Sequence, residues 1–119
     1  MRYRLAPPLA MVLVLALTSL APAQQLQVAL VKVSSPVSPR DDTAITVQTA
    51  PKASCMITVR YKSGPSKARG LDPREADAQG KVTWTWRVGS RTTPGKWPIT
   101  VTCSSGGRQG TLETSFVVR

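Results

Sequence analysis

The segment from residue 81 to residue 103, KVTWTWRVGSRTTPGKWPITVTC, alternates apolar and polar side chains on both sides of a turn rich in Gly and Pro. A period of two is typical of a β-strand with one buried face. The interleaved positions are mostly threonines, so the other face of each strand is expected to be exposed to solvent. The segment therefore predicts two antiparallel strands. Their inward sets are Val82, Trp84, Trp86 and Val88, then Trp97, Ile99, Val101 and Cys103.

The N-terminus has the build of a cleavable signal peptide. Arg2 and Arg4 precede an apolar run over 9–17, and small residues follow up to Ala23. The run is too short for a membrane helix, and we expect cleavage after Ala23. The predicted organisation is a signal peptide over 1–23 and one domain over 24–119, without a transmembrane segment once the signal is removed. The expected location is secreted, periplasmic or on the cell surface.

The exported part would have 96 residues and two cysteines, Cys55 and Cys103, both at inward strand positions. In an exported chain such a pair predicts a disulfide. A metal site is not expected, because the chain has no histidine to complete a ligand set with two cysteines. We also expect no cofactor.

Four further segments show strand patterns between turns rich in Gly, Pro and Asp, and the first of them changes its buried face near Lys32. They cover 26–33, 43–49, 54–62 and 111–118, with a long charged loop over 63–80. With no helical period, the chain is predicted to be all-β, an antiparallel sandwich of six to seven strands. A small closed barrel is the alternative architecture.

Three segments carry a resemblance to a known class of domain: SGPS at 63–66, WTWRVG at 84–89 and TTPGKWPI at 92–99. The chain resembles the secreted bacterial immunoglobulin-like modules that occur alone or appended to larger exported proteins. The resemblance is strongest over 55–103 and extends over 24–119. It implies an immunoglobulin-like sandwich outside the cytoplasm and says little about activity. In such folds the strands carrying Cys55 and Cys103 are neighbours in one sheet, whereas the antibody bridge joins two sheets.

The composition excludes hydrolases that use histidine, because the chain has none. Glu75 and Asp77 remain a formal pair for glycoside hydrolysis, and with Asp72 they could supply oxygens to calcium. Their loop setting and the interleaved Arg74 favour a solvated loop instead. We therefore expect no enzyme and no catalytic residue.

Two surface patterns have alternative interpretations. The three tryptophans could stack on sugars or bases, but their inward register favours core packing. Threonines on the wet strand positions could form a flat array of the kind that binds ice, although β-propensity alone explains them. These threonines are Thr58, Thr83, Thr85, Thr100 and Thr102.

The charge points to anionic partners. Without residues 1–23 the chain keeps fourteen basic and six acidic side chains, a net charge of +8. Such a domain is attracted to acidic polymers, although a solvated basic surface that aids solubility is the simpler explanation. The best candidate cluster lies on and beside the long loop. It comprises Arg60, Lys62, Lys67, Arg69 and Arg74, with backbone donors from 63–66.

These observations predict an exported, non-catalytic binding or structural module of the bacterial cell envelope. Its expected partner is an anionic envelope polymer or an extracellular protein, and not intracellular nucleic acid. The alternative is a basic secreted effector or inhibitor that makes contact through the loop over 63–80.

Overall fold

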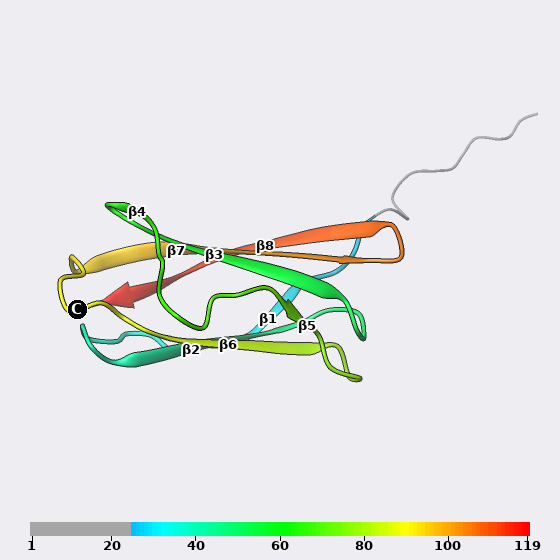
Figure 1. Cartoon of the computed structure of the whole chain (residues 1–119), viewed down its shortest axis with the longest axis horizontal. Helices are drawn as coiled ribbons and strands as arrows, with labels where there is room; N and C mark the ends of the chain where they lie inside the picture. Colours follow the sequence, from blue (N-terminus) through cyan, green and yellow to red (C-terminus); the bar gives the residue numbers. More distant parts are fainter. Residues whose placement is uncertain (1–24) are drawn as a thin grey trace, which may run out of the picture.

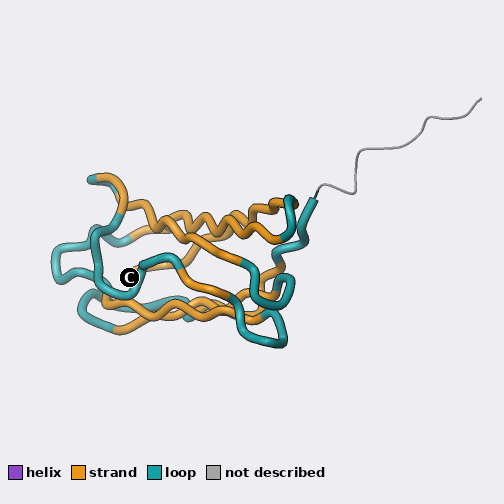
Figure 2. Tube along the Cα trace, turned by 45° about the vertical axis from the view of Figure 1, so that its right-hand side comes forward, coloured by secondary structure: helices purple, strands orange, loops and turns teal. Residues whose placement is uncertain are grey.

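The computed structural model describes residues 25–119, so the predicted signal peptide lies outside the described residues. These residues form eight β-strands and no helix, in two antiparallel sheets packed as a sandwich (Figure 1). Figure 2 shows the two layers of strands joined by loops. Within 25–119 no helix is long and apolar enough to cross a membrane. The predicted all-β sandwich is confirmed, and the structure is not a closed barrel.

The smaller sheet has three strands in the order β1-β2-β6. They are β1 (Ala29–Val33), β2 (Asp42–Gln48) and β6 (Lys81–Arg87). The pairing of β1 with β2 shifts register between Leu30 and Lys32, which is a β-bulge. A bulge re-aims the side chains of an edge strand, and this confirms the change of buried face predicted near Lys32.

The larger sheet has five strands in the order β4-β3-β7-β8, with β5 also paired to β3. The long strands are β3 (Ser54–Tyr61), β7 (Gly95–Ser105) and β8 (Arg108–Val118). Two strands of two residues each, β4 (Gly64–Pro65) and β5 (Arg74–Glu75), lie inside the predicted long loop. Six long strands thus match the predicted ones, and the short pair raises the total to eight.

The core lies between the two sheets and uses the predicted inward positions. Trp84 and Trp86 on β6 are 0% and 2% exposed, and they pack among the buried residues of β3, β7 and β8. Trp97 is only half-buried, because it lies near the start of β7 at the end of the sandwich. Its indole nitrogen donates to the Thr93 carbonyl at 2.8 Å. The inward register is therefore confirmed for two tryptophans and is incomplete for the third.

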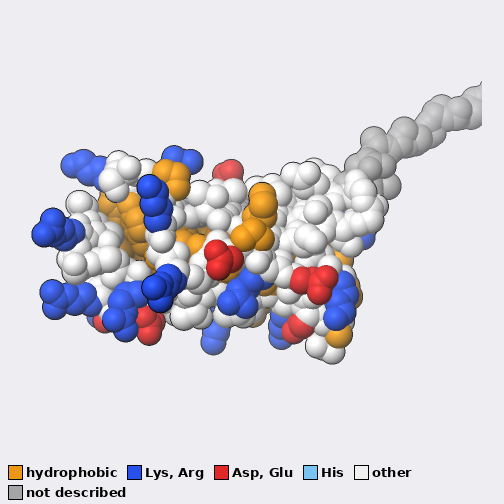
Figure 3. Space-filling view, in the orientation of Figure 1, with side chains coloured by type: hydrophobic (Ala, Val, Ile, Leu, Met, Phe, Trp, Pro, Cys, Tyr) orange, Lys and Arg blue, Asp and Glu red, His pale blue; other side chains and the backbone are white. Residues whose placement is uncertain are grey.

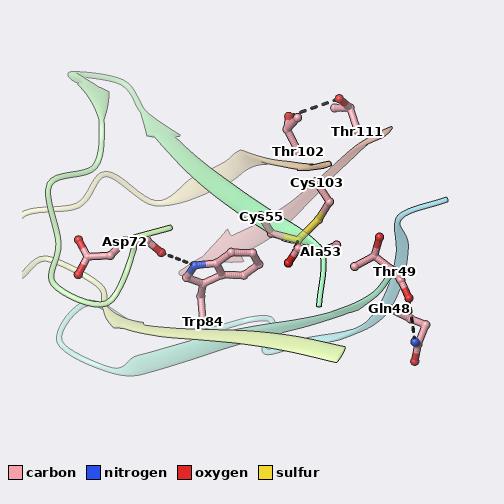
Figure 4. The surroundings of a disulfide bond; sticks show 9 residues. All are labelled: Gln48, Thr49, Ala53, Cys55, Asp72, Trp84, Thr102, Cys103 and Thr111. Atoms are coloured by element: carbon pink, nitrogen blue, oxygen red, sulfur yellow. Dashed lines mark hydrogen bonds between the residues drawn. A yellow bond between two sulfur atoms is a disulfide. The ribbon is translucent and has the colours of Figure 1, made fainter. Parts of the chain in front are cut away.

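The predicted disulfide is present, with a Cα–Cα distance of 4.0 Å between Cys55 and Cys103. The two residues are direct partners on β3 and β7, so the bridge lies within one sheet, as expected for neighbouring strands. Figure 4 shows Trp84 reaching toward the bridge from β6 in the opposite sheet. Its indole nitrogen donates to the Asp72 carbonyl at 2.8 Å, which ties the long loop to the core. A disulfide indicates an oxidising compartment.

Candidate functional site

One end of the sandwich contains a basic cleft of about 830 Å³. It lies at the end of β3. It is surrounded by the segment after β4, the last residues of β6 and the start of β2. In Figure 3, Lys and Arg side chains gather at this end around an area of hydrophobic side chains. The residues that matter below are Tyr61, Lys67, Arg69, Trp86 and Arg87, together with the hydroxyl-bearing residues Ser63, Ser66 and Thr92.

Lys67 and Arg69 reach the basic cleft because the loop that carries them is fixed to both sheets. The Ser66 amide donates to the Val59 carbonyl of β3 at 2.7 Å, and the Ser66 hydroxyl accepts the Ala68 amide at 3.1 Å. On the other side, Gly70 lies against the backbone of β6. A Cβ at Gly70 would collide with the Thr85 carbonyl oxygen, and the Gly70 φ of +97° also favours glycine.

Arg87 is the third cation of the basic cleft, and it comes from the outward register of β6. Its Nε donates to the Asp42 carboxylate at 3.3 Å, from the directly opposite position on β2. Both side chains are well exposed, at 71% and 63%, so the pair adds little stability. What it does is orient the guanidinium, whose remaining donors stay available to a ligand.

Tyr61 forms a rigid aromatic wall of the basic cleft. Its ring makes edge-to-face contacts with Trp97 and Phe116, at centroid distances of 6.0 and 6.1 Å. Its hydroxyl oxygen accepts a hydrogen bond from the Trp86 indole nitrogen at 3.4 Å. Burial raises the pKa of the Tyr61 hydroxyl above 10.0, although the bond from Trp86 opposes the rise. The phenol is thus neutral and keeps its proton at physiological pH.

A second hollow, the side depression, continues from the basic cleft around Tyr61. It measures about 530 Å³ and shares Tyr61, Ser63, Gly89 and Thr92 with the cleft. Two more cations line it, Lys62 from the β3–β4 turn and Arg91 from the β6–β7 loop. The two hollows therefore form one groove with five cationic side chains and the single carboxylate of Asp42.

Three of the five predicted anion-binding residues line the groove, and two do not. Lys67 and Arg69 line the basic cleft and Lys62 lines the side depression. Arg60 is exposed on β3, opposite Pro65 of β4. Arg74 pairs with Cys55. Cys55 precedes Arg60 by five residues on β3, which corresponds to about 17 Å at 3.3–3.4 Å per residue. Arg74 thus lies away from the other cations.

Sequence reasoning missed Arg87 and Arg91 as members of the same cluster, because both follow the long loop in the chain. The three segments that carry the resemblance, 63–66, 84–89 and 92–99, contained a signal for the position of the groove. All three contribute residues to the lining of the groove.

Of the acidic loop residues, Asp77 has a clear structural role. The Asp77 carboxylate accepts the amides of Gln79 and Lys81 at 2.9 and 2.8 Å and so closes the turn before β6. The bond from Lys81 is the main reason that the pKa of Asp77 is lowered below 3.8. Among the described residues, no three acidic or cysteine side chains gather into a group that could hold a metal ion.

The hypothetical threonine array is divided between the two outer faces of the sandwich. Thr58, Thr100 and Thr102 lie on the larger sheet, and Thr83 and Thr85 lie on the smaller one. Their hydrogen bonds are local cross-strand pairs, such as Thr102 with Thr111 at 3.3 Å. A single flat array of these five residues is therefore wrong, because neighbouring strands in the sequence belong to different sheets.

Comparison with solved structures finds a likeness in shape. No family model matches the chain, and no curated protein matches it. Among solved structures, the chain is similar to a conjugate transposon protein from Bacteroides vulgatus, with 10% sequence identity and a TM-score of 0.47. The likeness covers 86% of this chain and 91% of that one. At this level neither the fold nor the function of that protein transfers to this chain.

Proposed function

We propose that this chain is a non-catalytic binding module that acts outside the bacterial cytoplasm and docks on an anionic polymer of the cell envelope. One observation carries the proposal: Lys67, Arg69 and Arg87 line a single cleft whose wall is aromatic. Concentrated charge of one sign in a concave site attracts an oppositely charged ligand more strongly than the same charge spread over a surface.

Two further observations support the setting of this function. The disulfide fits an oxidising compartment, in agreement with the predicted signal peptide. The strand order also fits an immunoglobulin-like module, with β1, β2 and β6 in one sheet facing β3, β7 and β8 in the other. The within-sheet position of the bridge departs from the antibody pattern, so we infer the topology of such modules and not an antibody-like mode of binding.

The test is retention of the protein, purified after export, on envelope fractions across a salt series. One variant of the groove, called the cleft variant below, carries Lys67→Gln and Arg69→Gln from the basic cleft and Lys62→Gln from the side depression. The matched control carries Arg74→Gln, Lys81→Gln and Arg108→Gln, which removes the same charge from exposed positions outside the groove. Exposed ion pairs contribute about 0.2–1 kcal/mol each, so the cleft variant should bind roughly tenfold more weakly.

The control should bind within about twofold of the wild type at moderate salt, because distant exposed charges are screened beyond a Debye length. Equal losses in both variants would mean that overall charge, and not the groove, causes retention. Tight binding to one protein, indifferent to salt, would support the effector or inhibitor alternative instead.

A further inference from the structure

The groove holds a chemical feature that charge alone does not explain, namely the hydroxyl of Tyr61. This oxygen accepts the Trp86 indole proton at 3.4 Å. A phenol that accepts one hydrogen bond still has its own proton to donate. Since Tyr61 lines the hollow together with Lys67 and Arg69, that proton is available to an acceptor bound among the cations.

The ring of Tyr61 is held in place from several sides. Trp97 and Phe116 contact it edge-to-face, and Trp86 bonds its hydroxyl. It lines both the basic cleft and the side depression, so it stands where the two hollows meet. An aromatic ring that is fixed before binding costs little conformational entropy when a ligand packs on it.

The rest of the lining matches a sugar better than a bare inorganic anion. The lining includes residues with hydroxyl side chains, Ser63, Ser66 and Thr92, and residues with apolar surface, Pro65 and Ala68. A pyranose ring presents hydroxyls at its rim and C–H groups on its face, which fit donors and an aromatic wall respectively. The volume also falls within the roughly 300–1,000 Å³ of ordinary ligand sites.

We propose that the groove binds a linear polysaccharide whose sugars carry anionic substituents. One sugar packs on Tyr61, whose hydroxyl donates to the anionic group between Lys67 and Arg69. The chain continues into the side depression, where Lys62 and Arg91 meet the next anionic groups. This inference rests on the proposed function and names its ligand class. The anionic group is a carboxylate or a sulfate, because both accept from guanidinium, ammonium and phenol donors.

The experiment measures affinity for four probes by titration calorimetry at one salt concentration. The probes are oligogalacturonate, a sulfated galactan oligomer, inorganic polyphosphate of matched charge and neutral galactan. We expect one of the two acidic glycans to bind at least about tenfold tighter than polyphosphate, and neutral galactan to bind weakest. Stronger binding of oligogalacturonate would identify carboxylate as the preferred group, and the reverse would identify sulfate.

The variant Tyr61→Phe removes one oxygen and keeps the ring. It should weaken binding of the preferred acidic glycan by about tenfold, which is the usual effect of one hydrogen bond to a charged group. Thr100→Val, which removes a hydroxyl from β7 outside the groove, is the control and should leave the affinity unchanged. In nuclear magnetic resonance spectra of the wild type, glycan should shift the Trp86 indole N–H signal and leave that of Trp84 in place.

The outcomes separate the two proposals. If polyphosphate binds as tightly as both glycans, or if Tyr61→Phe binds normally while the cleft variant does not, the sugar assignment is overturned and the anionic groove remains. If none of the three anionic probes binds and the Trp86 signal does not move, both proposals fail.

Discussion

Removing the disulfide should lower the stability of the domain by about 4 kcal/mol. The bridge joins residues 48 positions apart, and the chain-entropy model gives about 4 kcal/mol at 25 °C for a loop of that length. Both cysteines are already direct partners in a strand pair, so the crosslink acts mainly on the unfolded chain. Domains of this size are stable by only about 5–15 kcal/mol, and the loss corresponds to a melting temperature lower by about 15–30 °C.

The assay is guanidinium unfolding followed by tryptophan fluorescence, since Trp84 and Trp86 are buried in the fold and exposed without it. Three samples are compared: the oxidised protein, the same protein reduced in denaturant and refolded under reductant, and the variant Cys55→Ala with Cys103→Ala. Reduced protein keeps both side chains, so its difference from oxidised protein isolates the crosslink. The dependence on denaturant should also steepen without the bridge, because a free unfolded chain exposes more surface. A difference below about 1 kcal/mol between oxidised and reduced protein would refute the reasoning.

Three further changes test how the loops are fixed. Gly70→Ala should destabilise the fold by about 1–3 kcal/mol and weaken envelope retention, because the new Cβ collides with the β6 backbone. The control is Gly107→Ala, which is also at positive φ but in open space. In the same denaturation and salt-series assays, this control should cost less stability and leave retention unchanged. Trp84→Phe should cost about 2–4 kcal/mol in chemical denaturation, because it leaves a cavity and an unpaired Asp72 carbonyl. Since folding lowers the pKa of Asp77 below 3.8, its stabilising contribution is present above that pH and is lost as the pH falls through the folded-state pKa. Asp77→Asn should therefore flatten the decline of melting temperature below pH 4, and an unchanged decline would show that other carboxylates cause it.

The sandwich could be predicted from the sequence because its strands are half-buried. Alternation over 54–62, 81–88 and 96–104 predicted which side chains face the core, and it also placed Cys55 and Cys103 inward. The pattern was incomplete at Trp97, which packs against the core but stays half-buried near the start of β7. Periodicity reports which face of a strand is buried and contains no information on how far the opposite sheet extends.

The groove could be predicted only in part, because the long loop runs along the molecule and not across its end. Its first part, with Lys67 and Arg69, stays near the end of β3, and its last part pairs as β5 near the beginning of β3. Arg74 is therefore close to Arg69 in sequence and distant from it in the fold. No propensity distinguishes a loop that closes on itself from one that crosses the sandwich lengthwise, since this is decided by contacts such as that of Gly70 with β6.

The position of the groove follows from the unequal lengths of the connections at the two ends. At one end the turns are short, as over 49–53 and 106–107. At the other end the longer connections over 34–41, 66–73 and 88–94 begin or end, and long loops have room for side chains that do not serve the core. Since β3 and β6 both pair antiparallel to strands that start at this end, their last residues and the loops after them converge there. Lys62 and Arg87 each stand at or just beyond such a strand end, in different sheets. Their presence at the same end of the sandwich is thus a consequence of strand direction, which explains why an anionic chain lying across this end would contact both sheets at once.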